Sequence, residues 1–316
     1  MSAETERIKL SSGRSIPVLG LGTLAPLEGE EEVIEAVKTA VRAGYRHIDC
    51  AAIYRNERAV GHALKELIVM GVVQREDLFI TSKLWNTCHR PDLVLPSLKK
   101  TLEDLFLEYV DLYLIHWPMA YREGGELNPL NEHGKTYNSD IDFVDTWQAM
   151  EDCQDMGLTK DIGLSNFNKR QIERVLEAAR IPPVTLQIEV SCHMTNSKLI
   201  EFAKSKNIVV VAYAPLGAPN VDSGDIRLLD EPVVKEIAEK YGKTPAQVAL
   251  RFVIQQGLVV IPKSINHKRI EENSKVFDFK LTDEDLSRLT ALNKGHRNYA
   301  EKIALEHKDY PFYDEY

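Results

Sequence analysis

The ionisable side chains Asp49, Lys83 and His116 each end a short apolar run of the sequence. A carboxylate beside an ammonium fixes the position of the ammonium, and burial of such a pair is costly enough to indicate a functional site. Tyr54 lies five residues after Asp49 and could reach the same centre. Because a nearby cation favours the phenolate, we expect Lys83 to lower the pKa of Tyr54 from its usual value of about 10, so that Tyr54 can exchange protons during turnover.

This set of side chains is typical of proton donation to a carbonyl oxygen while another group reduces the carbon. Side chains do not donate hydride, so the set implies a nicotinamide cofactor. A local group of basic residues follows the last apolar run, at Lys263, His267, Lys268 and Arg269. An ammonium and a guanidinium together suit a phosphate dianion, so this group predicts a phosphate site in an otherwise acidic protein.

Alternating strand and helix patterns must position these residues. Eight short apolar runs predict strands at Val18–Gly22, Tyr45–Asp49, Leu78–Lys83, Val110–His116, Asp161–Ser165, Thr185–Ile188, Ile208–Tyr213 and Leu258–Lys263. Amphipathic patterns between them predict helices, among them Glu30–Ala43, Pro91–Leu107, Phe143–Met156, Lys169–Ala179, Ser197–Ser205 and Glu231–Tyr241. Eight such units without a linker favour a single α/β domain over residues 1–316, closed as a (β/α)₈ TIM barrel. Ahead of them, Ile8–Leu10 and Ser15–Val18 predict a hairpin that could plug the bottom of the barrel.

Polar or aromatic residues end every predicted strand. They are Thr23, Asp49, Lys83, His116, Ser165 with Asn166, Gln187, Tyr213, and Lys263 with Ser264. In a barrel these ends converge on the face where active sites form, so we expect them to share one site. The segments Pro118–Ile141, Gly217–Asp230 and Gly295–Tyr316 lie outside the repeat, and we expect them to be loops or a tail, docked or flap-like, that carry substrate specificity.

Composition and charge exclude several other classes of protein. The 39 basic and 48 acidic residues give a net charge of −9, which argues against a nucleic-acid or anionic-membrane binder. No apolar run approaches the roughly 18 residues of a membrane span, and Met1–Arg7 lacks the features of a signal peptide. The cysteines Cys50, Cys88, Cys153 and Cys192 are widely spaced, so we expect reduced thiols, no metal, and a monomer in the cytoplasm.

Five ordered motifs carry a resemblance to a known family. They are Gly44–Asp49 followed by Tyr54 and Glu57, then Thr81–Trp85, Leu114–Pro118, Ile162–Phe167 and Ile261–Ser264. On these motifs the chain resembles the aldo-keto reductases, and His307–Phe312 in the tail resembles the aldose reductase and aldehyde reductase branch. A steroid double-bond reductase of this family has Glu where this chain has His116, so the resemblance implies reduction of carbonyl groups.

The resemblance implies a role for each matching residue. Tyr54 would be the general acid, Lys83 would lower its pKa, Asp49 would pair with Lys83, and His116 would orient the substrate carbonyl. The cofactor implied is NADPH, with the residues near it being Thr23, Leu24, Asp49, Ser165, Asn166, Gln187, Tyr213, Leu216, Lys263, Ser264, Asn266, Arg269, Glu272 and Asn273. The substrate, a small-molecule carbonyl compound, would lie against Leu24, Ile53, Tyr54, Trp85, His116 and Trp117.

Leu24 departs from the family pattern, which often has Trp at this position. The smaller side chain leaves room for a bulky ketone such as a ketosteroid, while sugar aldehydes, lipid aldehydes and ecdysteroid-like ketones also remain possible substrates.

Three alternative interpretations of the sequence remain. Gly20–Ala25 fits the phosphate loop of a Rossmann dehydrogenase, although Glu28 and Glu30–Glu32 would crowd a phosphate. His47, Asp49 and Cys50 could indicate a metal hydrolase. A catalytically weak NADPH sensor or a structural relative could share the fold.

Overall fold

The computed structural model describes residues 6–25, 29–217 and 227–316. Within these residues, eight parallel strands form one sheet in the order β10-β9-β8-β7-β6-β5-β4-β3. The strands are β3 (Gly20–Gly22), β4 (His47–Asp49), β5 (Phe79–Leu84), β6 (Val110–Ile115), β7 (Thr159–Ser165), β8 (Thr185–Glu189), β9 (Val209–Tyr213) and β10 (Val259–Val260). Parallel bridges join Leu19 to Val260 and Gly22 to Lys263, so the first and last strands meet and the predicted barrel is confirmed.

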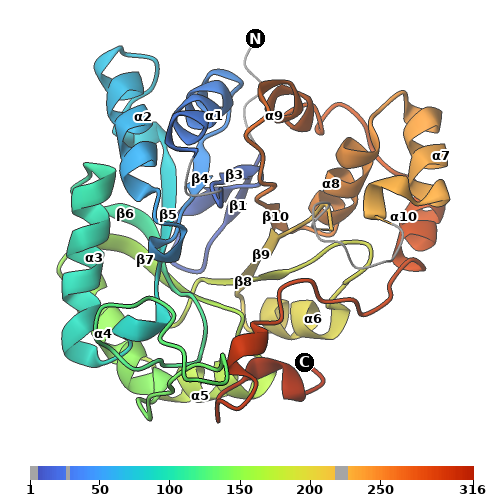
Figure 1. Cartoon of the computed structure of the whole chain (residues 1–316). Coiled ribbons are helices and arrows are strands. Elements are labelled where there is room, and N and C mark those ends of the chain that lie inside the picture. The colour runs from blue at the N-terminus through green and yellow to red at the C-terminus, as the bar shows by residue number, and fades with distance from the viewer. Residues whose placement is uncertain (1–5, 26–28, 218–226) are drawn as a thin grey trace.

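Helices surround the strands, as Figure 1 shows. In the described part of the chain they are α1 (Glu30–Arg42), α2 (Glu57–Val69), α3 (Pro91–Leu105), α4 (Phe143–Asp155), α5 (Lys169–Ala178), α6 (Ser197–Ser205), α7 (Pro232–Tyr241), α8 (Pro245–Gln255), α9 (His267–Asn273) and α10 (Asp283–Thr290). Local sequence sets their ends: proline occupies the first turn of α3, α7 and α8, where its missing N–H is not needed. All six helices named from the sequence are present, with shifts of at most two residues at their ends. None of the described helices is both long and apolar enough to cross a membrane.

Helix α1 illustrates how a helix buries one apolar stripe in the core. In α1 the buried side chains Val33, Ala36, Val37, Ala40 and Val41 recur at helical spacing, while Glu30–Glu32 occupy the first turn. This spacing directs one face of the helix to the core, and the acidic first turn complements the positive end of the helix dipole.

A hairpin closes the bottom of the barrel, as the N-terminal sequence predicts. Strands β1 (Arg7–Lys9) and β2 (Ser15–Pro17) pair antiparallel, with Ile8 opposite Ile16. Leu10 and Ile16 are buried in one apolar cluster with barrel residues such as Phe79 and Leu112. Burial of each such side chain contributes roughly 1.5–3 kcal/mol, so the plug stabilises the end of the barrel opposite to the predicted site.

The C-terminal segment is docked on the molecule. It runs in red from α10 to the vicinity of α5 in Figure 1, and short helical turns at Lys302–Ala304 and Pro311–Tyr313 interrupt it. Side-chain amides at the start of α5 hold it: Asn168, the residue before the helix, donates to the Pro311 carbonyl over 3.0 Å, and Gln171 donates to the Asp309 carbonyl over 2.8 Å. The long segment 118–141 is a loop, as expected. Most of the other expected loop, Gly217–Asp230, lies outside the described residues. The same holds for most of Met1–Arg7 and for Glu28.

Candidate active site

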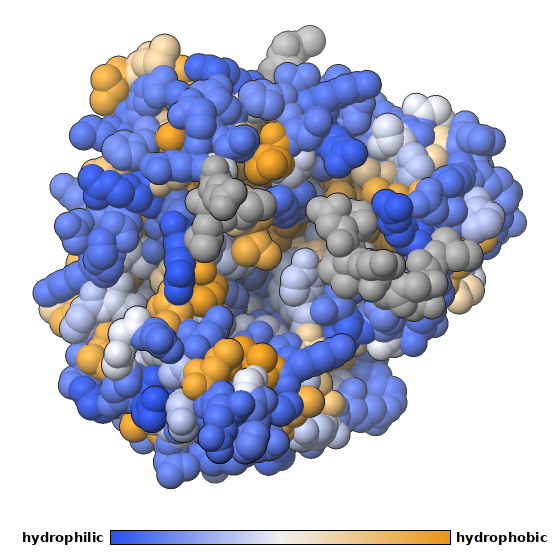
Figure 2. Space-filling view, in the orientation of Figure 1, coloured by the Kyte–Doolittle hydropathy of each residue, from blue (hydrophilic) through white to orange (hydrophobic). Residues whose placement is uncertain are grey.

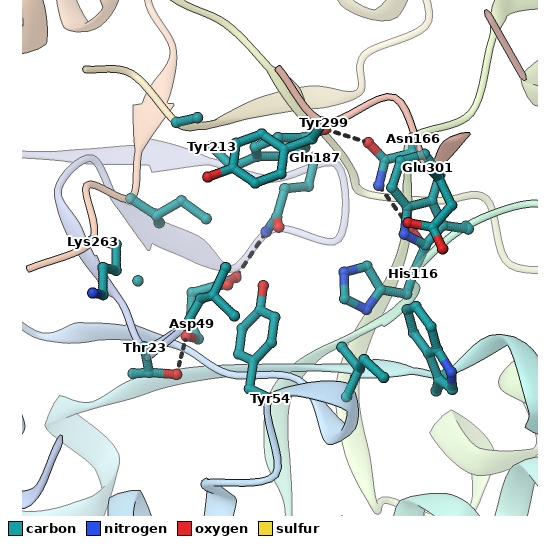
Figure 3. Close-up of a pocket in the computed structure, with 17 residues that line it drawn as sticks. Thr23, Asp49, Tyr54, His116, Asn166, Gln187, Tyr213, Lys263, Tyr299 and Glu301 are labelled. Carbon is teal, nitrogen blue, oxygen red and sulfur yellow. Dashed lines mark hydrogen bonds between the residues drawn. The ribbon is translucent and has the colours of Figure 1, made fainter. Parts of the chain in front are cut away.

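A cavity of about 260 Å³ opens at the carboxyl ends of the strands. Figure 2 shows this face of the molecule hollowed near its centre, and Figure 3 shows the side chains that line the hollow. Twelve of the residues named from the sequence line it: Thr23, Leu24, Asp49, Ile53, Tyr54, Trp85, His116, Trp117, Asn166, Gln187, Tyr213 and Lys263. Residues separated by more than 200 positions in the chain are therefore brought to one cavity.

Asp49, which lines the cavity, forms a buried ion pair with Lys83. They lie on the neighbouring strands β4 and β5. The Lys83 ammonium also donates to the Cys50 carbonyl over 2.8 Å, and Gln187 donates to the second oxygen of Asp49 over 2.7 Å. Burial alone would lower the pKa of Lys83, but Asp49 and Tyr54 raise it above its usual value, so the ammonium stays charged.

Tyr54 ends a short helical turn, Ala52–Tyr54, that directly follows β4. The Lys83 nitrogen lies 5.1 Å from the centre of its ring. The net shift of its pKa differs from our expectation: burial raises the pKa of Tyr54, and Asp49 raises it further, against the lowering by Lys83. The physical reason is that loss of hydration on burial outweighs the attraction of the phenolate to Lys83, and the charge of Asp49 adds to this effect. The phenol is therefore protonated at neutral pH, which is the form that donates a proton.

His116 follows β6 and faces Tyr54 across the cavity, as Figure 3 shows. The two rings lie edge to face with their centres 6.0 Å apart, and Trp85 contacts the imidazole from another side at 5.3 Å. Burial and the charge of Lys83 hold the pKa of His116 well below its usual range, so the imidazole is neutral. Nδ1 is buried without a hydrogen-bond partner among the described residues, and the residue itself lines the cavity.

Asn166 and Tyr213 form a second wall. Asn166, at a left-handed φ of 62°, donates from Nδ2 to the His116 carbonyl over 3.0 Å and to the Ser165 hydroxyl over 3.2 Å. The Tyr213 hydroxyl donates to Oδ1 of Asn166 over 2.7 Å. Ser165 is buried behind this wall, so it supports the cavity through Asn166. Thr23 lies opposite and donates its hydroxyl to the Asp49 carbonyl over 2.9 Å.

A second cavity, of about 610 Å³, lies beside the first, and Lys263 lines both. Its walls include the remaining residues named from the sequence: Leu216, Ser264, Asn266, Arg269, Glu272 and Asn273. Among the described residues, Lys263 and Arg269 form no ion pair with a carboxylate, whereas Lys268 pairs with Glu272 at 3.7 Å. Two cations without a protein counter-ion beside a cavity suit a phosphate ligand. Asn266 also caps α9, because its Oδ1 accepts from the Arg269 amide.

Comparison with known proteins agrees with this geometry. The model of the "Aldo/keto reductase family" matches residues 18–294. The chain belongs to this family. It is 49% identical to "Aldo-keto reductase family 1 member C23-like protein" of Equus caballus, over 98% of both chains, and 47% identical to "Estradiol 17 beta-dehydrogenase 5" of Mus musculus, over the full length of both. The solved structure of the aldose reductase from Schistosoma japonicum is 48% identical and superposes with a TM-score of 0.93, covering 98% of this chain and all of that one.

Family membership establishes the class of chemistry. Aldo/keto reductases are oxidoreductases that act on carbonyl and CH–OH groups with a nicotinamide cofactor, NAD(P)H. This confirms the carbonyl reduction and the barrel that the motifs predict. The Rossmann alternative is wrong, because Gly20–Gly22 is a barrel strand whose neighbours are β4 and the end of β10. The hydrolase alternative has no support either: His47 is buried and bonded to Thr81, and no group of three or more potential metal ligands occurs among the described residues.

Several lining residues of this aldo/keto reductase were missed by reasoning from sequence. Tyr299 and Glu301 reach the first cavity from the C-terminal tail, together with Gly22, Ala214 and Ile261 from the barrel. Arg227 and Asp230 line the second cavity. The glycine at position 22 was itself an indication of close packing. A Cβ there would lie 2.9 Å from the Ile261 carbonyl oxygen, so a larger residue would not fit. For the tail residues no local pattern indicates which side chains face inward.

Proposed function

We propose that this aldo/keto reductase uses NADPH to reduce an aldehyde or ketone to an alcohol, with Tyr54 as the proton donor. The observation that carries the proposal is the convergence of Tyr54, His116 and the Asp49–Lys83 pair on one cavity, which continues through Lys263 into a cationic one. The nicotinamide, when bound, supplies the hydride. Asn166 and Gln187 would hold its carboxamide, with Ser165 in support, Tyr213 would stack on its ring, and Thr23, Leu24 and Leu216 would border it.

The choice of NADPH over NADH rests on the second cavity. Lys263, Ser264 and Arg269 would bind the 2′-phosphate, Asn266 would lie beside it, and Glu272 and Asn273 would contact the adenine. The unpaired cations fit this group, because a phosphate dianion would replace the counter-ion that the described residues do not supply. On a ribose hydroxyl the same two cations would find no charge to neutralise.

The proton transfer follows from the charges at Tyr54. The neutral imidazole of His116 donates a hydrogen bond to the carbonyl oxygen and orients it between His116 and Tyr54. As the oxygen gains negative charge, the O–H bond of Tyr54 breaks and a new O–H bond forms on the product. The phenolate that remains is stabilised by the Lys83 ammonium, which Asp49 and Gln187 hold in place. Lys83 therefore acts on the phenolate that forms, while burial keeps the resting phenol protonated.

The walls of the cavity support a bulky ketone, such as a ketosteroid, as substrate. Trp85 and Trp117 supply apolar surface, and Ile53 packs against the same aromatic cluster. Leu24 is 43% exposed at the rim, so this side of the cavity is open. Two relatives bear names that fit this size, "Estradiol 17 beta-dehydrogenase 5" and "Prostaglandin F synthase 1" of Bos taurus, the latter 47% identical over the full length of both chains.

We also propose that the enzyme is a single-domain monomer of the cytoplasm. The site is complete within one chain, and the tail beyond the barrel docks on it. All four cysteines are free thiols, which suits a reducing compartment.

The decisive experiment is oxidation of NADPH by the purified protein with small aldehydes and a bulky ketosteroid. Turnover supports the proposal, and a high ratio of ketosteroid to small-aldehyde activity supports the substrate class. Tight binding of NADPH without turnover of any carbonyl compound would contradict it and favour a sensor.

A further inference from the structure

Glu301 places a carboxylate in the wall of the substrate cavity and contacts Tyr121, a member of the aromatic cluster that also contains Trp85 and Trp117. Figure 3 shows it on the same side of the cavity as His116 and Asn166. Trp85 contacts His116 with one edge and Tyr121 with another, at ring distances of 5.3 and 6.1 Å, and Tyr121 in turn contacts Glu301. Tyr121 and Trp85 thus link Glu301 to His116 through successive contacts, and we expect the carboxylate to face a part of the substrate other than the carbonyl that His116 orients.

This carboxylate has no cationic partner in the described chain. The Tyr121 hydroxyl donates to Oε1 of Glu301 over 3.0 Å, and the Glu301 carboxylate forms no ion pair among the described residues. Burial raises the pKa of Glu301, and the Tyr121 bond opposes this rise. The guanidinium of Arg297, another residue of the tail, lies 3.7 Å from the centre of the Phe312 ring. Its electrostatic partners are Glu189 and the tyrosines Tyr213 and Tyr310, so it is not the counter-ion of Glu301.

The backbone of the tail directs Glu301 into the cavity. Glu301 has φ 43° and ψ 55°, a left-handed conformation that is uncommon and strained for a residue other than Gly or Asn. The preceding residues are held by buried Glu189, which accepts the amides of Asn298 and Tyr299 over 3.0 and 3.1 Å. Strained residues cluster at ligand sites, where the surrounding structure enforces them.

We propose that Glu301 determines specificity by favouring carbonyl substrates that carry a cationic group remote from the carbonyl and by disfavouring those that carry a carboxylate there. An ammonium group would supply the missing counter-ion and would lie among aromatic rings that also attract cations. A substrate carboxylate would meet a like charge in a poorly solvated cavity. The inference deepens the proposed function and rests on it, because it concerns the same cavity and the same reaction.

The test compares aldehydes that differ only in one remote charge. The series contains benzaldehydes with a methyl, a carboxylate or a trimethylammoniomethyl group in the para position, and the corresponding biphenyl aldehydes for greater reach. For each aldehyde kcat/KM is measured with the wild type and Glu301→Gln, and the ratio of the two enzymes is taken, so that the intrinsic reactivity of the aldehyde cancels. Gln is isosteric with Glu and can still accept from Tyr121.

In at least one length series, we expect Glu301→Gln to lower kcat/KM for the cationic aldehyde about tenfold, to raise it for the carboxylate by a similar factor, and to leave the methyl compound within about twofold. Glu301→Asp keeps the charge and should keep the order of preference. Glu306→Gln, on an exposed residue of the same tail, serves as the matched control and should change none of the three.

Equal changes for all three aldehydes in both length series, or loss of the preference in Glu306→Gln, would overturn the inference while leaving the proposed function intact. Loss of the preference in Glu301→Asp to the same extent as in Glu301→Gln would also overturn it, because the charge would then not be the cause. If the wild type reduces none of the uncharged aldehydes, the proposed function fails first, and this inference fails with it.

Discussion

Replacement of Lys83 by Met separates the structural from the catalytic role of the buried ion pair. Met has a similar length and no charge, so Lys83→Met leaves Asp49 buried with Gln187 and without a counter-ion. Breaking a buried pair from one side typically lowers the free energy of unfolding by about 3–5 kcal/mol. The double variant Asp49→Asn with Lys83→Met leaves no buried charge, so it should recover most of this loss.

The pH dependence of Lys83→Met follows from the carboxyl that is left behind. Burial raises the pKa of Asp49, and Lys83 is the main group that opposes this rise. A carboxyl whose pKa is higher in the folded than in the unfolded protein favours the folded state at low pH, and this contribution is lost as pH rises through the folded pKa. The stability deficit of Lys83→Met relative to the wild type should therefore shrink on acidification.

Denaturant unfolding at several pH values measures the structural role of the pair. The kcat/KM for NADPH-dependent reduction measures its catalytic role. Both variants should lose activity by a factor of about 10²–10⁴, because neither has an ammonium to stabilise the Tyr54 phenolate. If Lys83→Met unfolds at the same denaturant concentration as the wild type, then Asp49 does not need Lys83 as a counter-ion, and the argument from the buried pair is wrong. Recovery of activity in the double variant would refute the catalytic role of Lys83.

Three further predictions test other parts of the site. Glu57 is buried against Ser82 and Thr101 with its pKa raised to about 7. Its contribution to stability is therefore full below about pH 4.5 and lost as pH rises through 7, and Glu57→Gln should flatten this part of the denaturation profile; an unchanged slope would contradict the burial argument. Arg269→Ala should weaken NADPH binding at least tenfold and NADH binding little, as measured by fluorescence titration, and equal losses would remove Arg269 from the phosphate site. Leu24→Trp should narrow the open rim and lower the ratio of ketosteroid to small-aldehyde kcat/KM several-fold, whereas an unchanged ratio would show that Leu24 does not limit the cavity.

The fold and the strand-end residues could be predicted because they depend on local sequence and on topology. Once the eight apolar runs form a parallel barrel, Asp49, Lys83 and His116 must lie on one face, whatever the loops do. The hairpin could also be predicted, since two short runs close together in the chain form an antiparallel pair, and its buried Leu10 and Ile16 pack against barrel residues.

The direction of the pKa shift at Tyr54 could not be predicted, because it is a balance of opposed effects. Proximity of a cation was expected from the motif, but the extent of burial and the opposing field of Asp49 are properties of the assembled cavity. Glu301 was missed for a related reason: its inward direction depends on long-range bonds between the tail and Glu189, which no periodic pattern reveals.

The most direct test of the central claim is a comparison of Tyr54→Phe with the wild type in NADPH-dependent reduction of one small aldehyde and one ketosteroid, with NADPH binding measured on the same samples. The variant lacks only the hydroxyl, so it should bind NADPH as the wild type does and retain less than about a thousandth of the wild-type kcat/KM. A variant that binds NADPH normally and keeps more than about a tenth of the wild-type rate would show that Tyr54 is not the proton donor.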